Sequence, residues 1–282
     1  MRRLTLFTHA RPQQTSDAVG RVIELAREAG VEVQVPQPEV DKHGIEQQDG
    51  VVLGADPAEE TDLALVLGGD GTILTTLRHY ARRDIPVFAV NFGTIGFLAT
   101  VEPDELDDGI GLALAGDFDT MSIPGLAADT TEGRQLGIND ISFHRRHTGR
   151  VAELAYSVEG EQLGEVRCDG LVVATPAGST GYNLANGGPV LAWGVAGYVV
   201  SFIAPHTLTA RALVVAPGDT LAVTNRSRHE DVEMTTDGRS VCVLPREGTI
   251  EIRFEPECAS LAQLPGATFY HRLRDKFGRL AY

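Results

Sequence analysis

Short apolar runs alternate with helical patterns through residues 1–121, and this alternation is the strongest constraint on the fold. The runs typical of buried strands cover residues 4–7, 31–35, 63–67 and 85–90. Helical spacing of apolar side chains predicts helices over residues 17–29, 73–82 and 104–115. Residues 36–60, rich in Pro, Gly and acids, are typical of a loop or a weak strand. This β–α order predicts a parallel sheet covered by helices.

The pattern changes after residue 121. Short β-rich runs follow one another with Gly and Asp turns between them, and helical periodicity is scarce. The expected strands cover residues 153–158, 171–175, 198–203, 213–215, 220–224, 232–235, 241–244 and 249–254. We therefore predict an α/β domain over residues 1–121, a mostly β domain over 122–270, and a C-terminal segment, 271–282, that returns to the first domain.

Charge and lysine content exclude several classes of function. The chain has 24 Lys and Arg against 39 Asp and Glu, a net charge of −15. Nucleic acids and anionic membranes are bound by clustered cations, so we expect neither as a partner. Lys42 and Lys276 are the only lysines, and neither follows a glycine. The phosphate-binding loop GxxxxGK[ST] is therefore absent, together with the ATP module built on it.

The cysteines and the apolar runs bear on the compartment. Cys168, Cys242 and Cys258 are widely spaced, which indicates reduced thiols and neither a disulfide frame nor a zinc site. The N-terminus turns polar after Phe7, too early for a signal peptide. The longest apolar run, residues 190–204, is interrupted by Gly and Ser and is shorter than a membrane span. We expect a cytoplasmic protein with this run in its core.

The segment GGDGT, residues 68–72, joins an expected strand to an expected helix. Its glycines permit a tight turn and let backbone N–H groups approach a phosphate, which the following helix N-terminus also favours. Asp70 then projects a carboxylate that would accept a hydroxyl proton or hold Mg²⁺. The alternative is a plain β-turn in which Asp serves the turn geometry. The candidate phosphate-donor loop consists of Gly68, Gly69, Gly71 and Thr72.

A second candidate ligand segment is DGLVVATPAGSTGYNLANGGP, residues 169–189. An apolar strand runs into a turn of small residues, which leave room for a ligand. The hydroxyl groups of this turn can bond ribose or phosphate, and Tyr182 offers a ring for stacking or a phenol donor. The alternative is a glycine-rich turn of a β domain.

Three shorter features carry less information by themselves. NFGTIGFL, residues 91–98, ends a strand as a Gly-rich loop but is not the GxGxxG fingerprint. Asn139 and Asp140 could clamp a diol or an amide, although a plain turn is the better interpretation of the pair alone. A hydrolase triad with Ser179 and His206 is disfavoured because the GxSxG elbow is absent around that serine.

Taken in order, GGDGT, NFGTIGFL, the Asn–acid pair and DGLVVATPAGSTGYNLANGGP resemble the NAD kinase family. LRDKF, residues 273–277, also resembles its closing segment. The resemblance implies the NAD kinase/diacylglycerol kinase-like fold, with an α/β domain that contains a parallel sheet and a mostly β C-terminal domain. It implies an enzyme, a phosphotransferase that uses ATP or inorganic polyphosphate and Mg²⁺ or another divalent cation. The acceptor it implies is the 2′-hydroxyl of the adenosine ribose of NAD, and the product is NADP.

The same resemblance implies roles for individual residues. Asp70 is the catalytic carboxylate and also contacts NAD. The other implied NAD-binding residues are Gly71, Asn139, Asp140, Arg167, Asp169, Thr180, Gly181, Tyr182, Asn183, Ala204 and Arg239. No metal ligand is assigned. The implied partners are NAD, ATP or polyphosphate, and further copies of the chain in a dimer or tetramer.

Three positions depart from the family pattern. Asp140 stands where Glu is expected, Gly181 replaces the Ala before Tyr182, and Arg239 replaces a frequent Gln. The shorter Asp side chain remakes or lengthens its hydrogen bonds, and the Arg adds a charge near the dinucleotide or the donor. ATP and polyphosphate both stay open as donor, and NAD and NADH both stay open as acceptor.

Two other classes of function stay open at this point. One is a non-catalytic NAD(P)-binding regulator on the same fold, against which the intact Asp70 argues. The other is a lipid kinase, since diacylglycerol-type lipid kinases also contain GGDG. The net charge of −15, with no basic cluster to face a membrane, argues against it.

Overall fold

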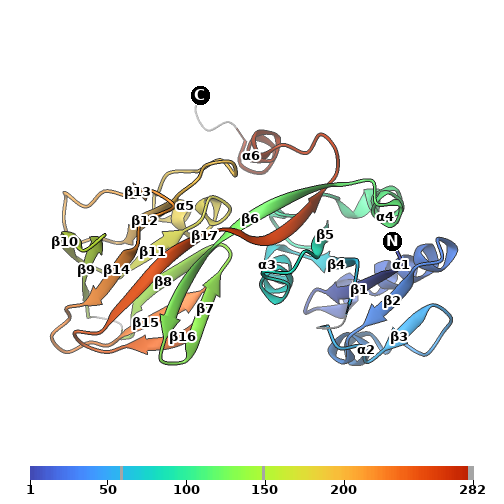
Figure 1. Ribbon diagram of the computed structural model, residues 1–282, viewed down its shortest axis with the longest axis horizontal. Coiled ribbons are helices and arrows are strands. Elements are labelled where there is room, and N and C mark those ends of the chain that lie inside the picture. The colour runs from blue at the N-terminus through green and yellow to red at the C-terminus, as the bar shows by residue number, and fades with distance from the viewer. Residues whose placement is uncertain (58–59, 148–149, 279–282) are drawn as a thin grey trace. The chain divides into compact units, whose positions relative to one another are not determined.

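The structure, a computed structural model, describes residues 1–57, 60–147 and 150–278 (Figure 1). The chain forms two compact units. Unit 1 comprises Met1–Ser122 and Ala259–Tyr282, and unit 2 comprises Ile123–Cys258. The second boundary was expected at residue 270, whereas the chain re-enters unit 1 at Ala259. The reason is that Ser260 and Leu261 pair with a strand of unit 1.

Unit 1 is built on a parallel sheet in the order β17-β5-β4-β1-β2-β3. All six residues of β4 are buried, which is typical of a parallel sheet covered on both faces. The strands are β1 (Arg3–Thr8), β2 (Glu32–Val35), β3 (Val51–Leu53), β4 (Leu63–Gly68), β5 (Pro86–Asn91) and the end of β17 (Thr249–Gln263).

Helices cover this sheet. The helices of unit 1 are α1 (Ser16–Glu28), α2 (Gln37–His43), α3 (Asp70–His79), α4 (Leu106–Ala115) and α6 (Phe269–Phe277), with 3-10 turns η1 (Pro12–Gln14) and η2 (Pro103–Glu105). α1 and α4 contact each other and share a core with Leu65 and Phe88. α3 packs on β4 and β5 through the buried Ile73 and Leu77. The expected strands and helices of residues 1–35 and 63–115 are confirmed, with α3 beginning earlier, at Asp70.

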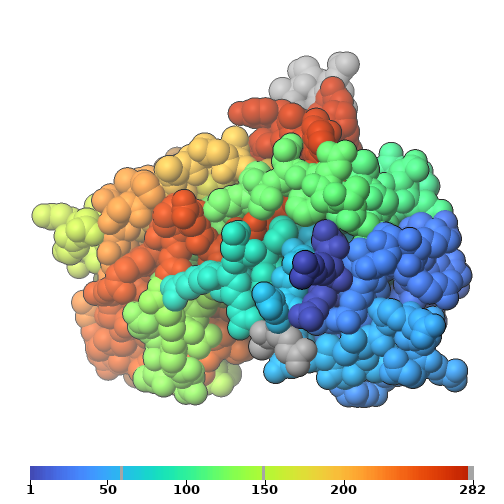
Figure 2. All heavy atoms as spheres, turned by 45° about the vertical axis from the view of Figure 1, so that its right-hand side comes forward, coloured from blue at the N-terminus to red at the C-terminus, as the bar shows by residue number. Residues whose placement is uncertain are grey.

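The expectation of a loop or weak strand over residues 36–60 was wrong in part. The chain forms α2 and the short strand β3 there. α2 has proline in its first turn, where the missing N–H is no loss, and ends at Gly44 with φ +62°. In the space-filling view the segments from β1 to α2, in blue, form one closely packed surface of unit 1 (Figure 2).

Unit 2 is a sandwich of two sheets with mainly antiparallel pairing. The first sheet has the order β13 (Leu213–Val215), β12 (Tyr198–Ile203), β11 (Gly170–Ala174), β8 (Asp140–Arg145), β15 (Val232–Thr236), β16 (Arg239–Leu244). The second has the order β10 (Glu161–Cys168), β9 (Ala152–Val158), β14 (Leu221–Asn225), β17, with β6 (Asp119–Thr130) beside β17 and β7 (Gly133–Gly137) beside β6. Phe143 and Val173 of the first sheet share one buried cluster with Leu154 and Leu221 of the second.

The eight strands expected in this unit are confirmed, and the fold class, an α/β domain with a parallel sheet plus a mostly β domain, is confirmed with them. β6, β7, β8 and β10 were not among the expected strands. β10 is an edge strand with a largely exposed polar sequence, so it lacks the apolar signal of a buried strand. A helical pair, η3 (Gly178–Thr180) and α5 (Tyr182–Ala185), follows β11. Among the described residues, no helix is both long and apolar enough to cross a membrane.

Replacing Leu65 by Ala is expected to lower the free energy of unfolding by about 3 kcal/mol, because a side chain 1% exposed would leave a cavity in the core of unit 1. Urea unfolding followed by circular dichroism measures this loss. Leu112→Ala, on α4 at 37% exposure, is the matched control and should change stability by less than about 1 kcal/mol. Equal losses in the two variants would contradict the assignment of Leu65 to the core.

Candidate functional site

Asp70 lies at the joint between β4 and α3, as the first residue of the helix. Its two carboxylate oxygens accept hydrogen bonds from two successive backbone amides. The N–H of Phe97 donates to Oδ2 at 3.1 Å, and the N–H of Leu98 donates to Oδ1 at 3.0 Å. The carboxylate is therefore fixed at a helix N-terminus, where negative charge is favoured, and each oxygen keeps a lone pair for another donor.

Two glycine loops meet beside Asp70. A Cβ on Gly69 would lie 2.9 Å from the Cα of Gly93, and a Cβ on Gly93 would lie 2.6 Å from the Cα of Gly69. Gly96 has φ +65°, and a Cβ there would collide with the side chain of Asn91. Glycine is therefore required for GGDGT and NFGTIGFL to approach each other closely enough for the amides to reach Asp70.

The described residues give a steric reason for glycine at position 68 of GGDGT but none at position 71. A Cβ on Gly68 would lie 2.8 Å from the Cβ of Thr72, so the packing of the turn itself excludes a side chain. A Cβ on Gly71 would meet no described atom within 4 Å. The neighbouring residues give no reason for glycine at position 71, which suits a surface left open to a ligand.

In unit 2, the predicted pair Asn139–Asp140 is held by the carboxylate of Asp237. That carboxylate accepts the N–H groups of Ile138, Asn139 and Asp140 at 3.1, 2.7 and 3.2 Å. Asp237 and Gly238 form the two-residue turn between β15 and β16, with φ of +46° and +75°. This is the backbone of a type I′ hairpin, and it aims the Asp237 side chain at the start of β8.

Asn139 connects this turn to the segment after β11. Its carbonyl oxygen accepts the N–H of Thr175 at 2.9 Å, and a Cβ on Gly178 would lie 1.9 Å from that oxygen. The Oδ1 atom of Asn139 is buried and has no hydrogen-bond partner among the described residues. A buried acceptor of this kind is satisfied when a ligand supplies a donor.

Asp140 is buried, with 6% of its surface exposed. Burial, together with the nearby carboxylate of Asp237, raises its pKa to about 7. The protonation of Asp140 therefore changes close to neutral pH.

A pocket of about 290 Å³ in unit 2 includes Asp169 and Tyr182 in its lining. The ring of Tyr182 stacks on His144 at 5.7 Å with 20° between the planes. Arg145 pairs with Asp169 through two contacts, Nε to Oδ1 at 2.8 Å and Nη2 to Oδ2 at 3.1 Å. Burial lowers the pKa of His144, so the imidazole next to Tyr182 is mainly neutral at pH 7.

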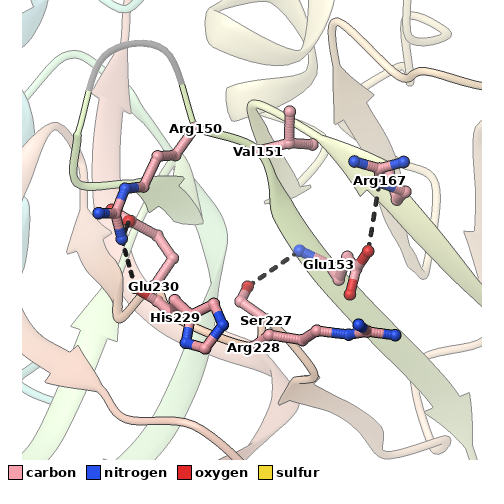
Figure 3. Close-up of a pocket in the computed structure, with 8 residues that line it drawn as sticks. All are labelled: Arg150, Val151, Glu153, Arg167, Ser227, Arg228, His229 and Glu230. Atoms are coloured by element: carbon pink, nitrogen blue, oxygen red, sulfur yellow. Dashed lines mark hydrogen bonds and ion pairs between the residues drawn. The ribbon is translucent and has the colours of Figure 1, made fainter.

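Arg167 does not line that pocket. It points into a second pocket of about 440 Å³ and pairs with Glu153, Nε to Oε1 at 3.2 Å (Figure 3). Figure 3 also shows Arg150 paired with the buried Glu230 on the opposite side. Arg167 and Asp169, placed next to each other by the sequence argument, thus face different pockets.

Two other predicted residues of unit 2, Thr180 and Asn183, form hydrogen bonds with the backbone of their own segment. Thr180 Oγ1 donates to the carbonyl of Ala177, and Asn183 Nδ2 donates to the carbonyls of Ser179 and Pro189. Asn183 is fully buried, which fits a residue that shapes the loop.

Gly181 lies close to the Asn139 side chain, since a Cβ on it would be 3.8 Å from Nδ2. Ala204 is exposed just after β12, with φ +43°, and Arg239 is exposed at the start of β16. Neither Ala204 nor Arg239 lines the 290 Å³ pocket.

The described part of the chain contains no group of three or more His, Cys, Asp or Glu side chains that could hold a metal ion. Mg²⁺ is usually bound through one or two carboxylates together with substrate phosphates.

Three residues that shape these sites were not among the predicted site residues: Asp237, His144 and Arg145. The Asp-Gly dipeptide at 237–238 is a strong hairpin signal, so that turn was open to prediction. His144 and Arg145 follow a weakly apolar stretch and had no comparable signal.

Comparisons with known proteins agree with this arrangement. Residues 10–118 match the family model of the ATP-NAD kinase N-terminal domain, and residues 138–264 match that of the ATP-NAD kinase C-terminal domain. The NAD kinase of Gemmatimonas aurantiaca is 36% identical over 225 residues, 77% of each chain. The NAD kinase of Aromatoleum aromaticum is 30% identical over 268 residues, 93% of this chain and 89% of that one.

Solved structures show the same fold. Yeast NADH kinase, crystallised with NADH, aligns with a TM-score of 0.89 at 21% identity, over 100% of this chain and 89% of that one. An NAD kinase from Archaeoglobus fulgidus, in complex with ATP, aligns with a TM-score of 0.75 at 24% identity, over 99% and 98% of the two chains.

The raised pKa of Asp140 predicts a pH-dependent stability. The folded state favours the protonated acid, so this contribution is complete below about pH 4 and is lost as the pH rises through 7. Asp140→Asn removes the ionisation, and at pH 8 it should raise the free energy of unfolding by on the order of 4 kcal/mol. Urea unfolding at pH 5 and pH 8 measures the effect, with the exposed Asp231→Asn as the control. An unchanged pH dependence in Asp140→Asn would refute the argument.

Proposed function

The chain belongs to the NAD kinase family, and from this we propose that it transfers the terminal phosphoryl group of ATP to the 2′-hydroxyl of the adenosine ribose of NAD, giving NADP. The observation that carries the proposal is the Asp70 carboxylate, fixed by two amides in a glycine turn at a helix N-terminus. The matches are to NAD kinases in both halves of the chain, and they do not favour a lipid kinase or a non-catalytic regulator.

Asp70 has the chemistry that the acceptor needs. A free lone pair on either carboxylate oxygen accepts the proton of the 2′-hydroxyl while the hydroxyl oxygen bonds to the γ-phosphorus. The bond from that phosphorus to the β–γ bridging oxygen breaks, and ADP leaves. Phosphoryl transfer depends mainly on positioning and charge stabilisation, so a carboxylate held by two hydrogen bonds suits this role.

The donor is proposed to be the magnesium complex of ATP. The absence of a metal-binding cluster among the described side chains supports a cation that enters with the phosphates. When bound, the cation neutralises charge on the phosphates. The open side of Gly71 and the N-terminus of α3 support phosphate binding at GGDGT.

The acceptor is proposed to bind through residues of unit 2. The unpartnered Oδ1 of Asn139 suits a ribose hydroxyl or an amide donor. Tyr182, 38% exposed and already stacked on His144, offers its other face to a base. Asp140, Gly181 and Asp169 lie around these two residues, and their contacts with NAD are part of the same proposal.

The remaining residues implied by resemblance, Arg167, Thr180, Asn183, Ala204 and Arg239, are proposed as NAD-binding on that basis alone. Asn183 is buried and holds its own loop, so its effect on NAD would be indirect. A homo-oligomer and a cytoplasmic location are likewise proposed from the family. Sedimentation velocity of the purified chain tests the oligomer.

The decisive experiment measures NADP formation from NAD or NADH with Mg²⁺ and either ATP or polyphosphate. Turnover with ATP supports the proposal, and the ratio of rates gives the preferred donor and acceptor. If NAD stabilises the protein against heat but neither donor yields NADP, the regulator function replaces it.

Asp70→Asn is expected to lower kcat by at least about 100-fold, since the amide cannot accept the hydroxyl proton. NAD affinity, measured by calorimetry, should stay within about threefold, because the substitution keeps the shape of the side chain. Asp104→Asn, an exposed acid on η2, is the control and should leave kcat unchanged. Near-normal turnover in Asp70→Asn would remove this residue from the reaction.

Tyr182→Ala is expected to raise KM for NAD more than it lowers kcat, because a stacking ring stabilises the bound ground state and the transition state alike. Tyr182→Phe separates the ring from the hydroxyl. If stacking is the role, the Phe variant behaves like the natural protein. An unchanged KM in the Ala variant would mean that Tyr182 only packs on His144.

A further inference from the structure

Arg272 is a buried arginine in α6, with 7% of its surface exposed. Its guanidinium donates from Nη1 to the carbonyl of Phe97 at 2.9 Å and to the carbonyl of Ala99, and from Nη2 to Oε1 of Gln263. Gln263 in turn donates from Nε2 to the carbonyl of Leu98 at 3.5 Å. Three successive carbonyls, those of residues 97 to 99, are thus held from the side of the C-terminal segment.

The amides of the same short stretch hold Asp70. The N–H groups of Phe97 and Leu98 donate to the Asp70 carboxylate. The carbonyl of Phe97 and the N–H of Leu98 belong to one planar trans peptide and point in opposite directions. Fixing that carbonyl with Arg272 therefore fixes the direction in which the N–H reaches Asp70. One rigid peptide therefore accepts a hydrogen bond from the Arg272 guanidinium and donates one to the Asp70 carboxylate.

Side chains of α6 hold the loop as well. The ring of Phe97 packs against Phe269, at 5.9 Å, and against Phe277, at 5.7 Å, near the two ends of the helix. Lys276 pairs with Glu102 at 2.6 Å, and Glu102 accepts a hydrogen bond from Asn91 at the start of the same loop. The loop therefore has little freedom to move while α6 is in place.

The charge of Arg272 is matched to this position. Burial lowers its pKa, the carboxylates of Asp70 and Glu102 partly oppose that change, and the resulting pKa is about 10. The guanidinium stays protonated at neutral pH and keeps its fork of donors. An apolar side chain of similar length would leave the carbonyls of Phe97 and Ala99 without these donors.

We propose that Arg272 is a positioning residue for phosphoryl transfer: it locks the 97–98 peptide and thereby the direction in which the Leu98 amide holds the Asp70 carboxylate. The inference rests on the proposed function of Asp70. Arg272 reaches Asp70 through the peptide, so its loss should impair orientation of the carboxylate rather than binding of NAD.

Arg272→Ala tests this with Arg274→Ala as the matched control, an exposed arginine two residues along the same helix. We expect kcat to fall by about 100-fold in Arg272→Ala, with KM for NAD within about twofold, and no change in Arg274→Ala. Added guanidinium at millimolar concentration should restore part of kcat, because it fills the space the side chain leaves. A kcat of Arg272→Ala equal to that of Arg274→Ala would overturn the proposal. So would a loss of kcat by about 100-fold that guanidinium does not restore and that comes with a raised KM for NAD.

Amide exchange provides a readout that does not require activity. Exchange at Phe97 and Leu98 should accelerate by at least about tenfold in Arg272→Ala and stay unchanged in Arg274→Ala. If the natural chain makes no NADP, the proposed function fails, and this measurement still decides whether Arg272 locks the loop. Equal exchange in the two variants would show that it does not.

Because removing a buried cation can prevent folding, Arg272→Lys is the second variant. Lysine keeps the charge but loses the planar fork that bonds two carbonyls and Gln263. We expect a folded protein with kcat lowered by about tenfold. Full kcat in this variant would mean that charge alone suffices and would refute locking by the fork.

Discussion

Parallel pairing of β4 with β5 is the constraint on which unit 1 and its candidate site depend. Register places Gly68, the last residue of β4, opposite Asn91, the last residue of β5. Both glycine loops therefore leave the sheet at the same edge, where ligands of parallel α/β sheets commonly bind. The missing side chains at Gly69 and Gly93 let the loops touch. The two hydrogen bonds to Asp70 follow from this register.

Asp70 and Asp237 both accept hydrogen bonds from backbone amides, but the two carboxylates have different roles. In unit 1 two backbone amides of one loop fix the Asp70 carboxylate, and each of its oxygens keeps a lone pair for another donor. In unit 2 the Asp237 carboxylate accepts hydrogen bonds from three backbone amides and fixes the start of β8. The second arrangement leaves Asp140 buried beside another carboxylate, and its raised pKa is the consequence. A carboxylate that bonds several amides is a structural element, whereas one left partly free can take part in chemistry.

Local patterns were enough to predict most elements and the loops that carry the candidate residues. Apolar runs marked the buried strands, and clusters of glycine marked GGDGT and the turn after β11. The prediction for residues 36–60 was wrong in part because α2 is short and polar, and β10 was not predicted because an exposed edge strand buries little. In neither case was a helical period mistaken for a strand period. These segments bury too few apolar side chains to produce a hydrophobic pattern in the sequence.

What sequence patterns could not supply is the set of contacts between distant segments. Asp237 reaches Asn139 across 98 positions, and Arg272 reaches Phe97 across 175. Such pairs leave no local trace, since a lone arginine in a polar helix is usually exposed. Because of the contact between Arg272 and Phe97, α6 must pack on the rest of unit 1 for the peptide that holds Asp70 to be fixed. The site in unit 1 is thus completed by the segment that begins at Ala259, and the stability of that segment sets how well Asp70 is oriented.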